Sequence, residues 1–161
     1  MATAGCKQLA CQPGGGPRLN GGTALGFDFG LRRIGVAVGD GLTQSAAPLA
    51  TINHGPHGPD WPAIDRLLTN YKPLNLVVGY PYNENGTPGS LAGAAGRFAE
   101  ELAQRSGLTV MRVDERYSSQ EASAELKQRR AVGTRRRRVQ RADVDSLAAA
   151  IILERWLRGE N

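Results

Sequence analysis

The chain has 161 residues, of which 40% are hydrophobic and 22% charged, as is typical of a globular protein with a single core. No apolar run approaches the roughly 18 residues that a membrane-spanning helix needs, and no secretory signal pattern opens the sequence, so we expect a cytoplasmic protein without a membrane partner. Two cysteines, Cys6 and Cys11, are too few for a disulfide framework and lack the spacing of a zinc site.

The positive charge of the chain is concentrated in one segment. The formal net charge is +5, and residues 129–141 (RRAVGTRRRRVQR) contain seven arginines and no acid. Without these seven charges the net charge becomes −2. A dense basic segment is typical of a protein that binds a polyanion, and arginine favours phosphate through its planar guanidinium. The alternative is a solvated loop whose charge aids solubility.

Residues 1–22 are rich in glycine, and we interpret them as a flexible N-terminal extension before a domain at 23–161. The domain opens with LGFDFGLRRIGVAVGD, residues 25–40, in which two alternating apolar runs predict a β-hairpin. One face of the hairpin carries large apolar side chains and the other carries very small residues.

Asp28 stands on the face with the small residues. Glycines within a strand often mark the close approach of a ligand or of another backbone. Two interpretations therefore remain open for Asp28. It is either a buried acid satisfied by local backbone donors or part of a metal or phosphate site that needs partners elsewhere in the chain.

The rest of the sequence predicts a third strand near 48–52, followed by alternating helices and strands. Asp60 is the expected N-cap of the first helix, and Gly107 ends the second. Late alternation of strands and helices predicts right-handed crossovers and an α/β fold. We expect a mixed five-stranded sheet, made of a three-stranded antiparallel meander and two parallel strands, with helices on both faces. The later elements are a helix from 60 to 71, a strand at 74–80, a helix at 89–106, a strand at 108–115, a helix capped by Ser118 and a last helix from 143.

Two further acids resemble Asp28 in their placement. Glu115 ends the fifth strand, and Asp145 lies in the first turn of the last helix, where Asp143 is the expected N-cap. Three carboxylates at one sheet edge would repel each other strongly unless cations neutralise them. Mg²⁺ or Mn²⁺ prefers such oxygen ligands, and two such ions can drive phosphodiester cleavage. The pattern favours a metal-dependent nuclease.

Six segments of the sequence resemble one known family, in order, over about residues 23–158. They are GFDFGLRRIGVAVGD, APLATI, LVVGYPYNENGT, FAEEL, VDERYSS and VDSLAAAIILERWL. On these motifs the chain resembles the YqgF-type pre-16S rRNA nucleases, also described as Holliday-junction-resolvase-like proteins. It departs from the family pattern in RYSS and GYP, and neither change touches the three acids.

The resemblance implies a ribonuclease-H-like fold with a divalent-metal site. Asp28, Glu115 and Asp145 match the three acidic positions of the family, which implies that they are catalytic and bind Mg²⁺ or Mn²⁺. The family is associated with maturation of the 5′ end of 16S rRNA, which implies the pre-ribosome as a partner. We expect the nucleic acid to be held by Arg32, Arg33, Arg116, Ser118, Ser119, Arg135, Arg136, Arg137, Arg138 and Arg141.

Several alternatives stay open at the level of sequence. Ser118 and Ser119 serve equally well as helix-capping residues. The substrate is either structured RNA or branched DNA, as in a Holliday junction, because phosphate contacts do not distinguish them. A non-catalytic nucleic-acid-binding factor for ribosome assembly is the main competing function. The protein is either a monomer or a homodimer.

Overall fold

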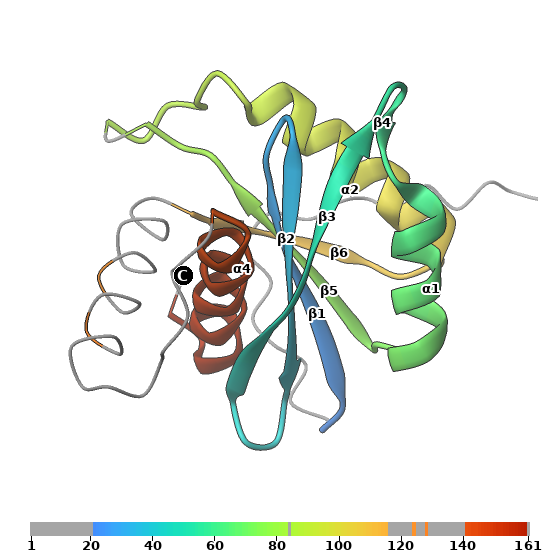
Figure 1. Cartoon of the computed structure of the whole chain (residues 1–161). Helices are drawn as coiled ribbons and strands as arrows, with labels where there is room; N and C mark the ends of the chain where they lie inside the picture. Colours follow the sequence, from blue (N-terminus) through green and yellow to red (C-terminus); the bar gives the residue numbers. More distant parts are fainter. Residues whose placement is uncertain (1–20, 84, 116–123, 125–127, 129–140, 161) are drawn as a thin grey trace, which may run out of the picture.

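The structure, a computed structural model, describes residues 21–83, 85–115, 124, 128 and 141–160. These residues form one mixed sheet with helices on both faces (Figure 1). The strand order is β4-β3-β2-β1-β5-β6. The first three strands of the chain form an antiparallel meander, whereas β5 and β6 lie parallel to β1. This arrangement confirms the expected ribonuclease-H-like α/β fold.

The sheet has six strands where the sequence predicted five. The additional strand, β4, is two residues long and pairs with the end of β3, which is itself longer than the predicted 48–52. This difference affects one edge of the sheet and leaves the five expected strands in place. The strands are β1 (Thr23–Phe29), β2 (Arg33–Asp40), β3 (Ser45–Gly55), β4 (Gly58–Pro59), β5 (Asn75–Tyr80) and β6 (Val110–Asp114).

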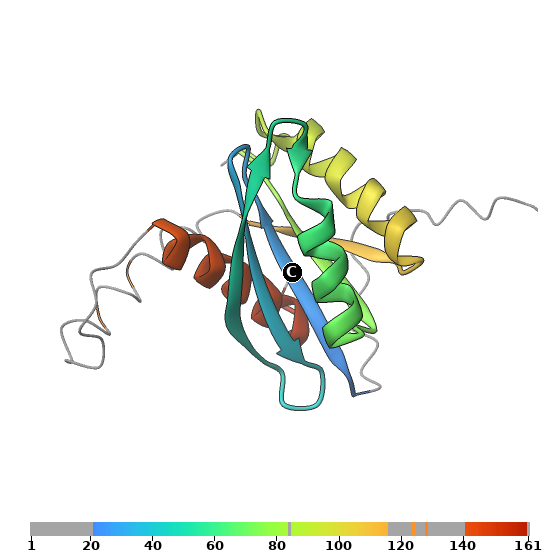
Figure 2. The ribbon, with the colours of Figure 1, turned by 45° about the vertical axis from the view of Figure 1, so that its right-hand side comes forward.

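Helices α1 (Trp61–Tyr71) and α2 (Ala92–Ser106) cover one face of the sheet, and α4 (Arg141–Arg158) covers the other (Figure 2). The predicted ends are confirmed where the structure describes them. The Asp60 carboxylate accepts the Ala63 backbone N–H at 3.1 Å, and Gly107 ends α2 with φ of 70°. The predicted N-cap role of Asp143 is wrong, because α4 begins at Arg141 and Asp143 lies inside its first turn.

Each face of the sheet has its own apolar core, as the alternation in β1 predicts. Leu25, Phe27 and Phe29 pack with Phe98 beneath α1 and α2. On the other face, small strand residues pack against the buried side chains of α4, Trp156 among them. The two sides differ in thickness because bulky strand residues face α1 and α2, whereas small ones face α4.

The glycines of the hairpin allow α4 to lie close to the sheet. A Cβ atom on Gly35 would stand 1.9 Å from the backbone oxygen of Asp145, and one on Gly26 would stand 2.8 Å from Cβ of Leu153. A Cβ on Gly39 would meet the side chains of Leu153 and Leu157. The close approach suggested by the glycine pattern is therefore, at these three positions, the approach of a helix.

Two predicted segments fall mainly or wholly outside the described residues. Residues 1–20 of the predicted extension are not described, although the Gly22 carbonyl accepts the Gly41 N–H at 3.0 Å. Of the predicted helix capped by Ser118, the structure describes residues 124 and 128, both helical, and Ser118 lies outside the described residues. The flexibility of residues 1–22 and the domain boundary at 23 stay predictions. Among the described residues, none of the helices is long and apolar enough to cross a membrane.

Candidate functional site

Asp28 lies near the end of β1 on the face covered by α4. It pairs in register with Gly35 of β2, and its flanking residues Phe27 and Phe29 point into the core on the opposite face. Because Gly35 lies directly against the backbone of Asp145, this register brings Asp28 close to the first turns of α4. The Asp28 residue is partly buried in this position.

Glu115 directly follows β6 and lies beside β5. Its backbone N–H donates to the Tyr80 carbonyl at 3.3 Å, which continues the parallel pairing of these strands. Its carboxylate lies over Gly79, where an added Cβ would stand 2.6 Å from Oε2. Gly79 therefore leaves the space that the Glu115 carboxylate occupies.

Asp28 and Glu115 are hydrogen-bonded to each other through their carboxyl groups. Burial, opposed by the hydrogen bond from Glu115 and assisted by the negative charge of Asp145, raises the pKa of Asp28 to about 6. Burial and the charge of Asp28 together raise the pKa of Glu115 to about 9. Near neutral pH the two groups therefore share a proton, which is how closely spaced carboxyl groups avoid carrying two buried charges.

Asp145 is the fifth residue of α4, and its carboxylate is bound by an arginine. Nε of Arg33, the first residue of β2, donates to Oδ2 of Asp145 at 2.6 Å. Within the described part of the chain, no three His, Cys, Asp or Glu side chains stand close enough together to chelate an ion. The fold thus brings a carboxyl pair and a third carboxylate to one end of the sheet, with the third bonded to Arg33.

The chemistry of these donors fits a hard divalent cation. Two carboxyl groups in contact and a third charge nearby offer the oxygen ligands that Mg²⁺ and Mn²⁺ prefer, with room for water or phosphate oxygen to complete the shell. A cation would replace the shared proton and balance the charge of two carboxyl groups whose pKa values are raised mainly by burial.

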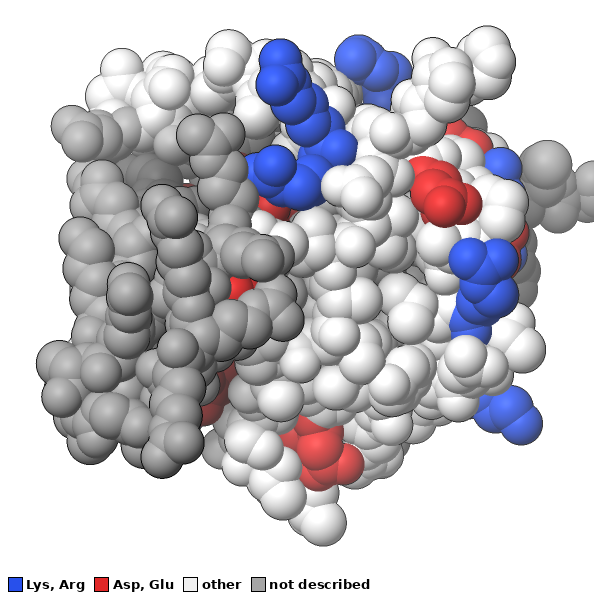
Figure 3. Space-filling model, in the orientation of Figure 1, with Lys and Arg blue, Asp and Glu red and all other residues white. Residues whose placement is uncertain are grey.

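Of the predicted phosphate-contacting residues, the structure describes the side chains of two. Arg32 is exposed in the β1–β2 turn, whereas Arg33 is bonded to Asp145. Figure 3 shows basic side chains at the upper centre of this face, with a small acidic surface directly beside them. Arg141 begins α4 without a described side chain. Outside the described residues lie Arg116, Ser118, Ser119, Arg135, Arg136, Arg137 and Arg138.

Two contributors were missed at the level of sequence. One is Gly79, whose signal was a glycine inside the otherwise bulky apolar run LNLVVGY. The other is the bond from Arg33 to Asp145, which joins residues 112 positions apart and has no local signal.

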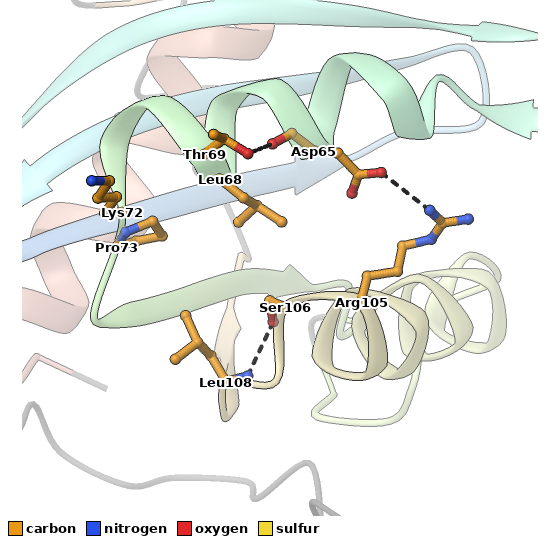
Figure 4. A pocket seen from close by; sticks show the side chains of 8 residues that line it. All are labelled: Asp65, Leu68, Thr69, Lys72, Pro73, Arg105, Ser106 and Leu108. Atoms are coloured by element: carbon orange, nitrogen blue, oxygen red, sulfur yellow. Dashed lines mark hydrogen bonds and ion pairs between the residues drawn. The ribbon is translucent and has the colours of Figure 1, made fainter.

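A separate hollow of about 560 Å³ lies on the other side of the sheet, between α1 and the end of α2 (Figure 4). Asp65 and Arg105 face each other across it, with 3.3 Å between Oδ2 and a guanidinium nitrogen. Its lining includes aliphatic, hydroxyl and charged side chains, and none of the three candidate acids. It is therefore not part of the carboxylate site.

Comparison with known proteins identifies the family. A family model described as "RuvX: Holliday junction resolvase" matches residues 22–159. The chain belongs to this family. A protein of Xanthomonas oryzae pv. oryzae (strain PXO99A) named "Putative pre-16S rRNA nuclease" is 46% identical over 145 residues, covering 90% of this chain and 93% of that protein. A relative of the same name from Xanthomonas campestris pv. campestris (strain B100) is 47% identical over 135 residues, 84% of this chain and 86% of its own.

Solved structures resemble the chain at low sequence identity. RuvC of T. thermophilus in complex with a Holliday junction substrate is 20% identical with a TM-score of 0.48, over 86% of this chain and 95% of that one. The yeast mitochondrial Holliday junction resolvase Ydc2 is 9% identical with a TM-score of 0.49, over 85% of this chain and 78% of its own.

The carboxyl pair predicts that Glu115→Gln stabilises the metal-free protein at alkaline pH. Because the pKa of Glu115 is raised in the folded protein, the stability contributed by this group falls as pH rises from its ordinary 4.5 towards 9. Glutamine keeps the shape without the need for a proton. In a chelator we expect the variant to melt about 3 °C or more above the unchanged protein at pH 8.5, the effect of ~1 kcal/mol in a domain of this size, and less at pH 5.

Glu101→Gln, which alters an exposed carboxylate of α2, is the control for loss of charge. A melting-temperature gain for Glu115→Gln that does not grow with pH, or that Glu101→Gln reproduces, would contradict the shared proton.

Close packing of α4 predicts unequal costs for two glycine substitutions in β2. Alanine at Gly35 would place Cβ against the backbone oxygen of Asp145, which moves only if α4 moves, so we expect a loss of about 3 kcal/mol in unfolding free energy. Alanine at Gly39 meets mainly the flexible ends of Leu153 and Leu157, and we expect a loss nearer ~1 kcal/mol. Urea unfolding of both variants checks this, and equal losses would show that α4 is not held against Gly35.

Proposed function

We propose that the chain is a divalent-metal-dependent nuclease that hydrolyses phosphodiester bonds, with Asp28, Glu115 and Asp145 as ligands of Mg²⁺ or Mn²⁺. The observation that carries the proposal is the hydrogen-bonded pair of Asp28 and Glu115, partly buried and close to the charge of Asp145. A fold gains no stability from collecting acids in this way. The arrangement is useful to a protein that places a cation there.

The proposed substrate is the 5′ end of precursor 16S rRNA, processed in the cytoplasm on the pre-ribosome. The support is the name shared by relatives that are 46–47% identical over most of the chain. The alternative substrate is a Holliday junction, supported by the description of the family model. Two copies of the chain would suit a symmetric four-way junction, whereas one suffices to trim an RNA end.

A non-catalytic nucleic-acid-binding factor for ribosome assembly is the competing function. Binding alone would need positive charge, which the segment 129–141 supplies from outside the described residues. It would not need buried carboxylates at the same end of the sheet as Arg32, since negative charge there repels phosphate. The acids therefore favour the enzyme over the binding factor.

In the proposed mechanism the chain's own residues hold and shape the site. Asp28 and Glu115 would hold the ion through their carboxylates once the shared proton is lost, and Asp145 would be the third acidic ligand. A bound Mg²⁺ or Mn²⁺ would supply an activated water and charge neutralisation at the phosphate. Arg32, exposed in the β1–β2 turn, would bind a backbone phosphate, and α4 covers the face of the sheet on which Asp28 lies.

A cleavage assay tests the nuclease proposal directly. A labelled precursor 16S rRNA 5′ leader and a labelled four-way DNA junction are incubated side by side with Mn²⁺, with Mg²⁺ and with chelator. We expect metal-dependent cutting of the leader that falls at least 10²-fold in Asp28→Asn and in Glu115→Gln, because each change removes a ligand. Asp65→Asn, on the opposite face, is the control and should cut normally.

Cutting of the junction in place of the leader would move the substrate to branched DNA and keep the mechanism. No cutting of either substrate, or equal cutting by Asp28→Asn, would overturn the enzyme and favour the binding factor.

The basic segment predicts how binding depends on salt. Replacing Arg135 to Arg138 by glutamine should lower the slope of log Kobs against log salt by up to about 3, since each lost phosphate contact removes ~0.7–0.9. Binding of the leader is measured in chelator, so that no cutting interferes. A double variant of Arg105 and Arg158, which pair with acids elsewhere on the surface, is the control. An unchanged slope would show that the segment does not contact phosphate.

A further inference from the structure

The ion pair between Arg33 and Asp145 joins the start of β2 to the first turns of α4. Nε and Oδ2 are 2.6 Å apart, and the two side chains are 32% and 26% exposed. Such a pair is neither fully solvated nor sealed in the core. Through this contact the negative charge of Asp145 has a positive partner. The contact lies at the end of the sheet where Asp28 and Glu115 share a proton.

The backbone of Asp145 has little freedom, whereas its carboxylate can turn. Gly35 lies so close to the Asp145 carbonyl that even one methyl group would not fit between them, so the helix cannot shift towards the strand. A change of partner must therefore come from rotation of the Asp145 side chain. Its charge already acts on Asp28, so the distance to be covered is short.

A carboxylate oxygen that accepts the Arg33 N–H at 2.6 Å is not available to a metal in the same place. The guanidinium carries one positive charge and stands where a cation would otherwise balance Asp145. The bond holds the Asp145 carboxylate beside the first residue of β2, and among the described residues no three acids lie close enough together to hold an ion.

We propose that Arg33 and the metal ion compete for Asp145, so that Arg33 acts as a positioning residue that holds the third acid away from the carboxyl pair until a metal binds. This inference rests on the proposed metal site and adds a regulatory step to it. Metal binding then frees the guanidinium within reach of the site, where its planar fork can take a substrate phosphate. Metal binding would thus precede the binding of substrate phosphate by Arg33.

The test is a calorimetric titration of the full chain with Mn²⁺, without nucleic acid, so that affinity and not cleavage is read. Arg33→Gln should bind Mn²⁺ about three- to tenfold more tightly, because the competing bond is gone. Arg33→Lys, which keeps a positive partner for Asp145, should remain within about twofold of the unchanged protein. Thermal melting of each variant first establishes that it is folded.

Arg32→Gln is the matched control. It removes the same charge from the neighbouring position, and Arg32 has an exposed side chain and a backbone carbonyl bonded to His54. A general loss of positive potential would tighten Mn²⁺ binding equally in Arg32→Gln and Arg33→Gln, whereas direct competition affects Arg33→Gln alone. We expect less than a twofold change for Arg32→Gln.

The outcomes separate this inference from the proposed function. If the unchanged protein binds Mn²⁺ and Arg33→Gln binds it equally or more weakly, the competition is overturned while the metal site stands. Equal tightening in both glutamine variants also overturns it. If the unchanged protein does not bind Mn²⁺, the metal site and the competition fail together.

Discussion

The site depends on how closely α4 lies against the strands β1 and β2. Glycines at positions 26, 35 and 39 remove the side chains that would hold the helix away, and the Asp145 carbonyl fills the space above Gly35. Since Gly35 pairs in register with Asp28, the same contact fixes the distance between the first strand and the last helix. Two acids that are more than a hundred residues apart in sequence become neighbours through backbone packing, which tolerates little variation.

Electrostatics follows from this packing. Once β6 delivers Glu115 over Gly79, the two carboxyl groups of Glu115 and Asp28 are in contact in a poorly hydrated place, and a proton must lie between them when no cation is present. The carboxylate of Asp145 is bonded to Arg33 instead of to this carboxyl pair. Without a metal, one shared proton and the guanidinium of Arg33 offset the negative charge of the three acids. A divalent ion would replace the proton and compete with the guanidinium.

Sequence reasoning reached much of this because the signals were local. Alternation in β1 separated Phe27 and Phe29 from Asp28, and Gly107 marked the end of α2. It failed where the deciding contact was distant. The start of α4 at Arg141, the extra strand β4 and the bond of Arg33 to Asp145 depend on packing between elements, for which a single sequence carries no periodic signal. The roles of the three acids as ligands stay predictions.

One face of the sheet carries the aromatic core that stabilises β1, and the other carries the candidate acids. On the side of α1 and α2, Phe27, Phe29 and Phe98 form a thick aromatic core that anchors β1 on both sides of Asp28. A carboxylate held between two such anchors cannot retreat into solvent when its charge becomes unfavourable. The strand therefore keeps Asp28 in place while its protonation or ligation changes, and the free energy of aromatic burial offsets the repulsion on the other face. A strand anchored on one face alone can hold a charged group in position on the other.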